Sequence, residues 1–282
     1  MKEYQFKTSG QTRTERDLLG EKEVPTEALF GIQTLRCIEN FDISRQLLSH
    51  YPPFVKALGL VKMGAVKANN ELKLINDEIT NAIVEACQEL MDGKHTEHFP
   101  IDLVQGGAGT SVNMNANEVI ANRALEILGK KRGEYKYCHP NDHVNMAQST
   151  NDAYPTAMHL GLYMLHDELK ASLEKLIESF EKKSIEFKEM VKMGRTQLQD
   201  AVPMTLGESL GAYMDAMKNE LKRIDAASKE FLTINMGATA IGTGITAEPG
   251  YAELCTQYIK DISGWDIVLA ENLVEATNDT SA

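Results

Sequence analysis

The feature that most constrains this chain is a run of residues, 162–193, that contains neither glycine nor proline. Its apolar residues recur at spacings of three and four, which is the period of one face of an α-helix. They are Leu165, Leu169, Leu173, Leu176, Phe180, Phe187 and Val191. At about 1.5 Å per residue, the run predicts a helical rod about 48 Å long.

A second run with apolar residues at helical spacing extends from about residue 206 to residue 234. Only residues 194–205 separate the two runs, and helices joined by a short connection are antiparallel neighbours in a bundle. A coiled-coil scaffold would have the same apolar stripes. The sequence therefore predicts a mainly all-α fold that contains the first long antiparallel helices of a central helical bundle.

The residues before these rods predict shorter helices and irregular loops. Residues 1–15 read as a loose tail, and residues 24–41 mix Pro, Gly and apolar residues in an irregular pattern with short helical pieces. Helices are expected from Pro52 to about Leu72, from the capping residue Asn76 to Gly93, from the glycine-rich loop near residue 105 to Gly129, and from about Tyr251 to Ser263. We expect an N-terminal helical domain over 1–148 and a partial bundle domain over 149–282.

The net charge, the lengths of the apolar runs and the cysteine spacing indicate which partners and which cellular compartment to expect. The net charge of −12 argues against nucleic acid and anionic membranes as partners. No apolar run approaches the roughly 20 residues that span a bilayer, and the polar N-terminus does not resemble a secretory signal. The four cysteines, at 37, 87, 138 and 255, form no CxxC pair. We therefore expect a cytoplasmic protein with reduced thiols.

Four segments are too polar and too rich in glycine for simple connections. Their Thr, Ser, Asn and Gln side chains are neutral hydrogen-bonding groups, glycine lets the backbone approach a ligand, and N–H groups at helix starts favour anions. The four are GGAGTSVNMN (106–115), HPNDHVNMAQSTND (139–152), GRTQLQDAVPMT (194–205) and GATAIGTG (237–244). Together they suit a small polyanion such as a dicarboxylate.

Simpler explanations exist for single members of this set. The stretch from Ser149 to Asp152 precedes a long helix and could serve only as an N-cap. There is no phosphate-binding GxxxxGK[ST] loop, and the GTG of the fourth segment lacks the strand–turn–helix context of a dinucleotide site. His139 and His143 hint at a metal, but Pro140 and the loop context argue against a helical two-His zinc site. No cofactor and no metal are expected.

The four segments, in this order, resemble the fumarase/aspartase superfamily. The resemblance covers nearly the whole chain from about Thr14, beginning with ERDLLGEKEVPTEALFGIQTLR. It continues through QGGAGTSVNMNANEVIANRA, HPNDHVNMAQSTNDAYPT, KMGRTQLQDAVPMTLGE and GATAIGTGI. It implies elimination of an amine or water from a succinyl skeleton to give fumarate, through an aci-carboxylate with two negative charges. By this resemblance, Thr110, Ser149 and Thr150 bind that carboxylate.

The resemblance also implies the identity of the leaving group. Asn151, Thr196 and Gln197 would lie near the leaving group and the other end of the substrate. Fumarases carry a stretch similar to GRTH here, with His where this chain has Gln197, and some aspartases also carry His. Water needs help with its protons, whereas a protonated amine leaves readily as ammonia. The aspartase branch, which acts on L-aspartate, is therefore favoured over class II fumarase.

The resemblance also implies that these 282 residues do not hold a whole active site. The superfamily's base is a Ser on a loop resembling GSSIMPxKxNP, and no such segment occurs in these 282 residues. Its members are tetramers whose sites combine loops from three subunits. We therefore expect an N-terminal portion of a homotetrameric enzyme that is inactive alone, with a non-catalytic helical assembly fragment as the alternative. His139, with Asn141 and Asp142, also resembles the fumarases' second dicarboxylate site.

Overall fold

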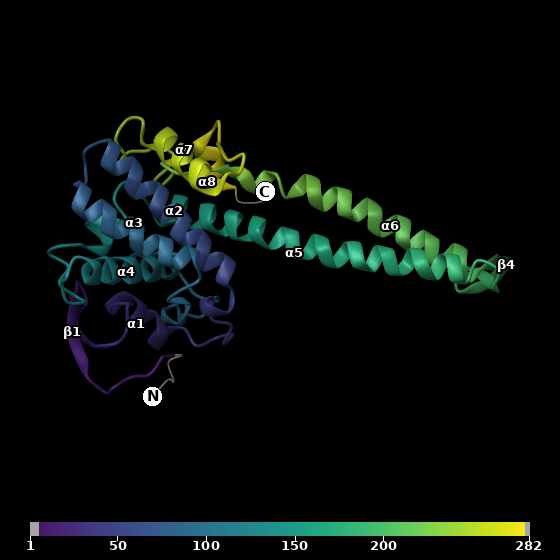
Figure 1. Cartoon of the computed structure of the whole chain (residues 1–282), viewed down its shortest axis with the longest axis horizontal. Coiled ribbons are helices and arrows are strands. Elements are labelled where there is room, and N and C mark those ends of the chain that lie inside the picture. The colour runs from purple at the N-terminus through teal and green to yellow at the C-terminus, as the bar shows by residue number, and fades with distance from the viewer. Residues whose placement is uncertain (1–5, 280–282) are drawn as a thin grey trace. The chain divides into compact units, whose positions relative to one another are not determined.

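A computed structural model of the chain describes residues 6–279 (Figure 1). The described part is mainly helical, with only two-stranded sheets, so the predicted fold class is confirmed. It divides into two compact units: residues up to Leu162 together with those from Phe231 onward, and Tyr163–Glu230. The expected domain boundary at 148/149 stays a prediction. No helix in the described range is long and apolar enough to cross a membrane.

The first unit contains most of the elements. They are β1 (Thr12–Asp17), β2 (Gly20–Pro25), α1 (Ile32–Asn40), α2 (Pro52–Glu71), α3 (Asp77–Met91), α4 (Thr110–Ile127), a π-helical turn (Pro140–Val144), the start of α5 (Thr150–Glu186), β5 (Thr233–Ile234), α7 (Tyr251–Ser263), β6 (Val268–Leu269) and α8 (Leu273–Asn278). Single 3₁₀ turns occupy Leu48–His50, Thr96–His98 and Glu230–Leu232. The helices expected at α2, α3, α4 and α7 are all present. Asn76 caps α3 as expected, because its side chain accepts a hydrogen bond from the Ile79 N–H.

Helix α2 is the centre of the first unit. Its residues are buried on nearly every side, and it packs against α3, α7 and α4. A helix that is apolar all round is stable only when other elements surround it. Two positions break this apolar pattern, because Lys62, in the middle of α2, and Asn69, near its end, are both fully buried.

The expected loose tail is wrong for the residues that form β1. Strand β1 pairs antiparallel with β2, from Thr12 opposite Pro25 to Asp17 opposite Gly20. The Arg13 guanidinium donates to the backbone carbonyls of Pro25, Ala28 and Phe30. One side chain thus fixes a segment whose polar sequence predicted no structure. Residues 1–5 of the expected tail lie outside the described range.

Helix α1 has no capping side chain of its own. Instead Glu118, buried on α4, accepts hydrogen bonds from the backbone N–H groups of Gly31, Gln33 and Thr34. These are the unpaired donors that every helix start carries. A cap from more than 80 residues away cannot be read from local sequence, which is why residues 24–41 were expected to hold only short helical pieces in an irregular pattern.

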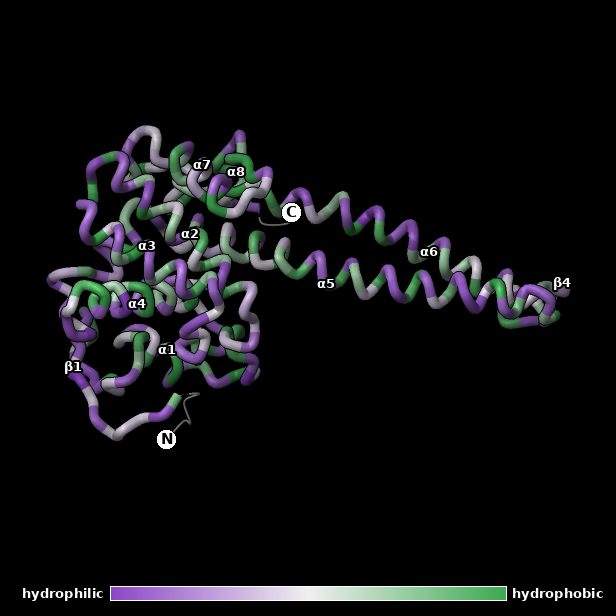
Figure 2. The backbone as a smooth tube through the Cα atoms, viewed as in Figure 1, coloured by the Kyte–Doolittle hydropathy of each residue, from purple (hydrophilic) through white to green (hydrophobic). Residues whose placement is uncertain are grey.

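The second unit holds the rest of α5, the strands β3 (Val191–Thr196) and β4 (Gln199–Thr205), and α6 (Leu206–Ala227). Within it α5 and α6 run antiparallel, as expected. Lys170 pairs with Asp225 at one end, and the Ser184 hydroxyl donates to the Gly207 carbonyl at the other. Apolar and polar residues alternate along both helices (Figure 2).

Both rods end earlier in the sequence than predicted, and the first also begins earlier, at Thr150. The first ends at Glu186 rather than near Met193, because residues 191–196 form β3. The second ends at Ala227 rather than near Ile234. The connection between them is an antiparallel hairpin whose two-residue turn is Gln197–Leu198, with positive φ at both residues. This mirror-image turn matches the twist of paired strands and usually carries Asn or Gly.

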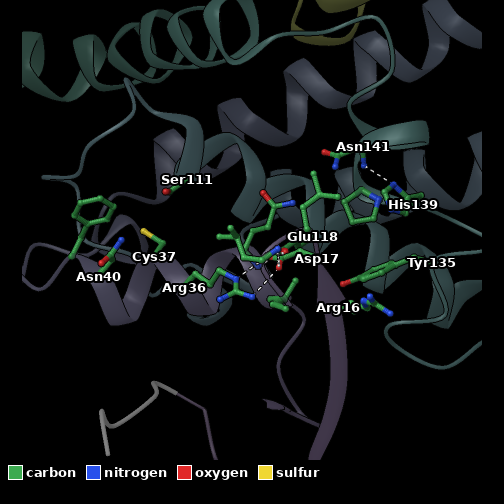
Figure 3. A pocket seen from close by; sticks show the side chains of 16 residues that line it. Arg16, Asp17, Arg36, Cys37, Asn40, Ser111, Glu118, Tyr135, His139 and Asn141 are labelled. Atoms are coloured by element: carbon green, nitrogen blue, oxygen red, sulfur yellow. Dashed lines mark hydrogen bonds and ion pairs between the residues drawn. The ribbon is translucent and has the colours of Figure 1, made fainter. Parts of the chain in front are cut away.

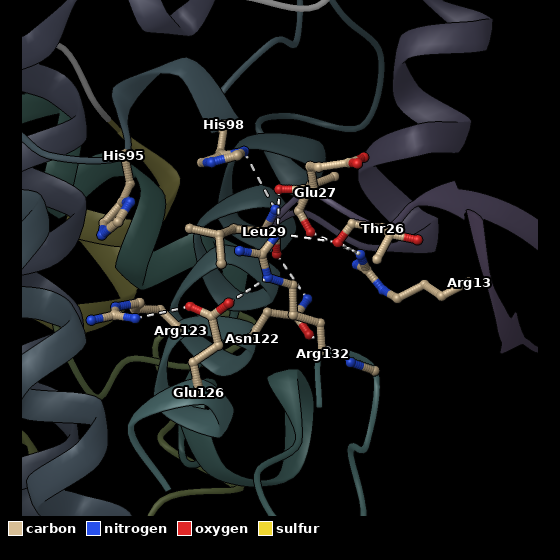
Figure 4. Close-up of polar contacts among 12 residues, drawn as sticks. Arg13, Thr26, Glu27, Leu29, His95, His98, Asn122, Arg123, Glu126 and Arg132 are labelled. Atoms are coloured by element: carbon tan, nitrogen blue, oxygen red, sulfur yellow. Dashed lines mark hydrogen bonds and ion pairs between the residues drawn. The ribbon is translucent and has the colours of Figure 1, made fainter. Parts of the chain in front are cut away.

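An ion-pair chain joins α3 to α4 and to the β2–α1 loop. Arg123 pairs with Glu89 at 2.6 Å and with Glu126 at 2.9 Å, and Glu126 pairs with Arg132 at 2.7 Å. Arg132 then donates to the backbone carbonyls of Thr26 and Glu27. Figure 4 shows the chain from Arg123 through Glu126 to Arg132.

These ion pairs make the stability of the fold depend on pH. The hydrogen bond from Arg123 lowers the pKa of Glu89 from 4.5 to about 2. A lowered pKa stabilises the folded state above about pH 5, and that stability is lost as the pH falls towards 2. We expect Glu89→Gln to lower the unfolding free energy by about 2 kcal/mol at pH 7 and by little near pH 2.5. Urea titrations at several pH values measure this.

The matched control is Glu85→Gln, which changes an exposed carboxylate on the same helix. Its unfolding free energy should follow that of the unmodified chain at every pH. Equal pH dependence of the Glu89→Gln variant and the unmodified chain would contradict the assignment.

Candidate functional site

The starts of α4 and α5 face a common pocket of about 330 Å³ in the first unit. Of the residues predicted to bind substrate, Thr150 and Asn151 line it. Thr110 and Ser149 are the chain neighbours of the lining residues Gly109 and Thr150. The complete lining is Leu103, Gln105, Ala108, Gly109, Thr150, Asn151, Tyr154, Pro155, Met158 and Thr277.

The glycine-rich loop before α4 is held against α5. Gly107, Ala108 and Gly109 have φ values of 87°, 49° and 86°, so three successive residues adopt the left-handed conformation. The Thr110 hydroxyl donates to the Gly107 carbonyl at 2.6 Å, which closes the loop on itself. A Cβ at Gly109 would lie 2.5 Å from the ring of Tyr154. Glycine at 109 therefore lets this ring touch the loop backbone.

The start of α5 is capped by its own residues. The Asn151 N–H donates to the Ser149 hydroxyl at 3.1 Å, and the Ser149 N–H donates to Asp152 Oδ1 at 3.0 Å. Ser149 and Asp152 therefore do cap the start of α5, as the simpler explanation of residues 149–152 expected. Asp152 Oδ2 also accepts the Thr239 N–H at 2.9 Å. This hydrogen bond joins the fourth polar segment, residues 237–244, to the start of α5. Burial raises the pKa of Asp152 to about 6, against the effect of these N–H groups.

Pro155 shapes the first turns of α5. Proline has no N–H, so the helix supplies no donor to the carbonyl of Asn151 four residues earlier. The buried Asn235 side chain supplies it instead, at 3.1 Å, and its own oxygen accepts the Thr156 hydroxyl at 3.2 Å. Asn235 therefore anchors the helix start at the point where the proline interrupts its hydrogen bonds.

The buried Lys62 of α2 links α4 to the segment that precedes α5. Its ammonium donates to Asn113 Oδ1 at 2.6 Å, to Gln148 Oε1 at 2.7 Å and to Asn145 Oδ1 at 3.0 Å. Three acceptors match the three N–H donors of a protonated lysine. Burial lowers the pKa of Lys62 to about 7, and the charge of Asp152 opposes that shift. The sequence signal for this residue was a lysine with apolar neighbours on both sides, Val61 and Met63, within α2.

The network also orients the hydroxyl of Thr150. Asn113 Nδ2 donates to Thr150 Oγ1 at 3.3 Å. A hydroxyl that accepts in this way keeps its own hydrogen for another partner. Thr150 lines the pocket at the start of α5, where backbone N–H groups and the helix dipole favour negative charge. The pocket therefore suits a small anion.

Thr196 and Gln197 belong to the second unit. Thr196 ends β3, and Gln197 forms the hairpin turn with Leu198. All three are exposed, and Leu198 is 99% exposed. A non-glycine residue with positive φ is strained, and such strain is frequent at functional sites. The hairpin thus presents Thr196 and Gln197 outward from the second unit.

A larger cavity of about 730 Å³ lies elsewhere in the first unit (Figure 3). It contains His139 and Asn141 but none of the six predicted substrate-binding residues. Several of its charged groups already have partners within the protein. Arg36 pairs with Asp17 at 2.7 Å, and Glu118 caps α1. The His139 Nδ1 accepts the backbone N–H groups of Asn141 and Asp142, which caps the π-helical turn.

One group of side chains has the spacing of metal ligands. Potential ligand atoms of His95, Glu97 and His98 lie within 4.8 Å of one another. His98 Nδ1 accepts the Leu29 N–H at 3.3 Å, which leaves the proton of a neutral ring on Nε2 (Figure 4). Burial lowers the pKa of His98 to about 3. The ring is therefore neutral and oriented by the backbone, and this hydrogen bond competes with metal coordination.

Residues 20–282 match the protein family described as Lyase. An aspartate ammonia-lyase of Pseudomonas aeruginosa is 54% identical over 272 residues, which cover 96% of this chain and 57% of the relative. The corresponding protein of Escherichia coli K12 is 49% identical over 275 residues, or 97% of this chain and 58% of that protein. The chain thus spans somewhat more than half the length of these relatives.

Two solved structures are similar to the whole fold. A fumarate lyase:delta crystallin from Brucella melitensis, bound to cobalt, has a TM-score of 0.91 at 49% identity, covering 94% of this chain and 58% of that one. A class II fumarase from Schistosoma mansoni has a TM-score of 0.85 at 33% identity, covering 94% of this chain and 59% of that one.

Proposed function

This chain belongs to the Lyase family that its residues 20–282 match, and we propose that it is the substrate-cradling part of an aspartate ammonia-lyase. The reaction is the elimination of ammonia from L-aspartate to give fumarate. The observation that carries the proposal is the pocket at the starts of α4 and α5, where Thr150 and Asn151 lie with Ala108 and Gly109 of the loop before α4. The Asn151 side chain also donates to the Ala240 carbonyl, within residues 237–244. The names of the relatives at 49% and 54% identity support the same activity.

The proposed chemistry uses this pocket to bind the charge that develops during the reaction. Removal of the proton next to one carboxylate converts that carboxylate into a doubly negative aci form. Preorganised donors aimed at its oxygens lower the barrier, because they need no reorganisation during the reaction. We assign this role to Thr110, Ser149 and Thr150. The contact from Asn113 to Thr150, itself fixed by Lys62, supports a preorganised hydroxyl.

We assign the leaving-group end to Asn151, Thr196 and Gln197. Gln197 cannot act as an acid, but its amide can bind an ammonium or a carboxylate. Ammonia leaves from a protonated amine without a further proton, whereas water does not leave readily without one. Gln197 therefore favours ammonia elimination over fumarase activity.

The proposal includes a cytoplasmic homotetramer in which the hairpin of one copy completes the site of another. Support comes from exposed apolar side chains of the second unit, which include Leu169, Leu176 and Tyr213. Such surface is unfavourable in water and drives association. The four cysteines are buried and none of them is in a disulfide, as suits a reducing compartment.

Fumarate absorbance in the ultraviolet tests the activity. Residues 1–282 are joined to the remaining part of the Pseudomonas aeruginosa relative and given L-aspartate or L-malate. We expect fumarate from L-aspartate at least tenfold faster than from L-malate. The 282-residue chain alone should form none, because it has no segment like the serine-base loop. Faster reaction of L-malate would favour fumarase, and activity of the chain alone would place a base within it.

A further inference from the structure

Lys62 is a buried cation whose three acceptors are all held in place by the protein. Its ammonium donates to side-chain oxygens of Asn113, Asn145 and Gln148. The amide nitrogens of Asn145 and Gln148 donate to the backbone carbonyls of Gln148 and Val144, which fixes the orientation of both side chains. Asn113 Nδ2 donates in turn to Asn145 Oδ1 at 3.0 Å. None of these amides can therefore turn to donate to a neutral lysine without breaking another hydrogen bond.

The hydrogen bonds that lead from Lys62 to the pocket all point in one direction. The ammonium donates to Asn113 Oδ1 at 2.6 Å, and Asn113 Nδ2 donates to Thr150 Oγ1 at 3.3 Å. Thr150 lines the pocket, and its hydroxyl keeps its own hydrogen for a ligand. Aligned hydrogen bonds polarise one another, and they are electrostatically stronger in the protein interior than in water. A positive charge on Lys62 therefore strengthens the donor that meets an anion at the other end.

Few other charges act on Lys62. From the elements packed around α2, the ionisable groups that do so are Asp152, Cys87 and Cys255. Burial raises the pKa of both thiols far above neutrality, so only Asp152 is charged above pH 7. The other charged residues of α2, which are at least partly exposed, are Lys56, Lys67 and Glu71. Because burial opposes the ammonium and Asp152 favours it, the pKa of Lys62 is about 7, and a nearby anion can shift its protonation.

We propose that protonation of Lys62 and binding of a carboxylate at the start of α5 are coupled, so that each favours the other. Lys62 does not line the pocket, and it acts as a positioning residue through Asn113 and Thr150. This inference rests on the proposed function and adds a pH-dependent control to the same pocket. Coupling between two sites is reciprocal, so an ammonium that favours the anion is itself favoured by the anion to the same degree. Binding above pH 7 should therefore take up a proton, and the affinity should fall as the pH rises.

Calorimetric titration of the 282-residue chain with succinate tests the coupling. Carboxylic acids have pKa values of about 4–5, so this ligand keeps its charge between pH 7 and pH 8.5. We expect its affinity to fall about fivefold or more over this range, which corresponds to a coupling of ordinary size. At pH 7.5 the binding enthalpies in HEPES and in Tris should differ as uptake of about half a proton per ligand requires.

Three variants assign the proton to Lys62. Folded Lys62→Met should bind succinate about fivefold or more weakly at pH 7, with the same affinity at each pH and no proton uptake. Lys67→Met changes a half-buried lysine on the same helix and should behave as the unmodified chain does. If Lys62→Met does not fold, Asp152→Asn decides the matter. It removes the charge that favours the ammonium, so the fall in affinity should move to lower pH.

Each outcome bears on a different claim. A constant affinity from pH 7 to pH 8.5 without proton uptake would overturn the coupling, although the pocket would keep its assignment. Proton uptake that persists in folded Lys62→Met, or no shift in Asp152→Asn, would also overturn it, because another group would then be titrating. If the unmodified chain binds no succinate at any pH, the pocket itself fails, and the proposed function fails with it.

Discussion

Replacement of Lys62 by methionine is expected to lower the unfolding free energy by about 3–5 kcal/mol. The substitution removes the donor to Asn113 Oδ1, Gln148 Oε1 and Asn145 Oδ1. Asn145 Oδ1 keeps the amide of Asn113 as a donor. The oxygens of Asn113 and Gln148 lose this partner inside the protein, and an unsatisfied buried acceptor is costly. Urea unfolding at pH 7 measures the change.

Lys67→Met is the control on the same helix. Lys67 is only half-buried, and its ammonium lies 5.9 Å from the centre of the Tyr258 ring. A partly exposed cation over a ring contributes about 0.5–1 kcal/mol, so we expect a loss of that order. If Lys62→Met is no more destabilising than Lys67→Met, the ammonium is not the centre of the network.

Replacement of Gly109 by alanine is expected to cost about 2–4 kcal/mol and to abolish ligand binding. The left-handed conformation at φ 86° is unfavourable for alanine. The new Cβ would also lie 2.5 Å from the ring of Tyr154, which lines the pocket. Either the ring or the loop must move, and both changes alter the pocket. Thermal unfolding and titration with L-aspartate measure the two effects.

Gly106→Ala is the matched control in the same loop. A Cβ at Gly106 would lie 3.4 Å from the Phe41 ring, which is a tolerable contact. We expect this variant to stay within about 0.5 kcal/mol of the unmodified chain and to bind ligand. Equal effects at positions 106 and 109 would show that the contact with Tyr154 does not set the pocket.

Periodicity was enough to predict α2, α3, α4 and α7 of the first unit, because a buried face repeats along each of them. It failed where the chain changes from helix to strand. Apolar residues continue past Glu186 to Val191 at helical spacing, so no local signal ends the rod before β3. The turn at Gln197–Leu198 lacks the Asn or Gly that usually marks a two-residue hairpin. Only the pairing of the two strands reveals it.

The candidate site, too, could be predicted only in part from the sequence. Thr150 and Asn151 could be placed at a helix start because polar residues followed by an apolar run indicate a helix N-terminus. The residues that hold them could not be predicted, since each acts across a long sequence separation. Lys62 reaches Asn113, and Asn235 reaches the carbonyl of Asn151.

Hydrogen exchange with and without L-aspartate shows directly where the substrate binds. If the substrate binds at the starts of α4 and α5, backbone amides within 106–113 and 149–153 should exchange more slowly in its presence. Amides around the larger cavity, near Arg36 and Asn141, should not change. Protection confined to the larger cavity, or no protection at either helix start, would contradict the assignment of the substrate to this pocket.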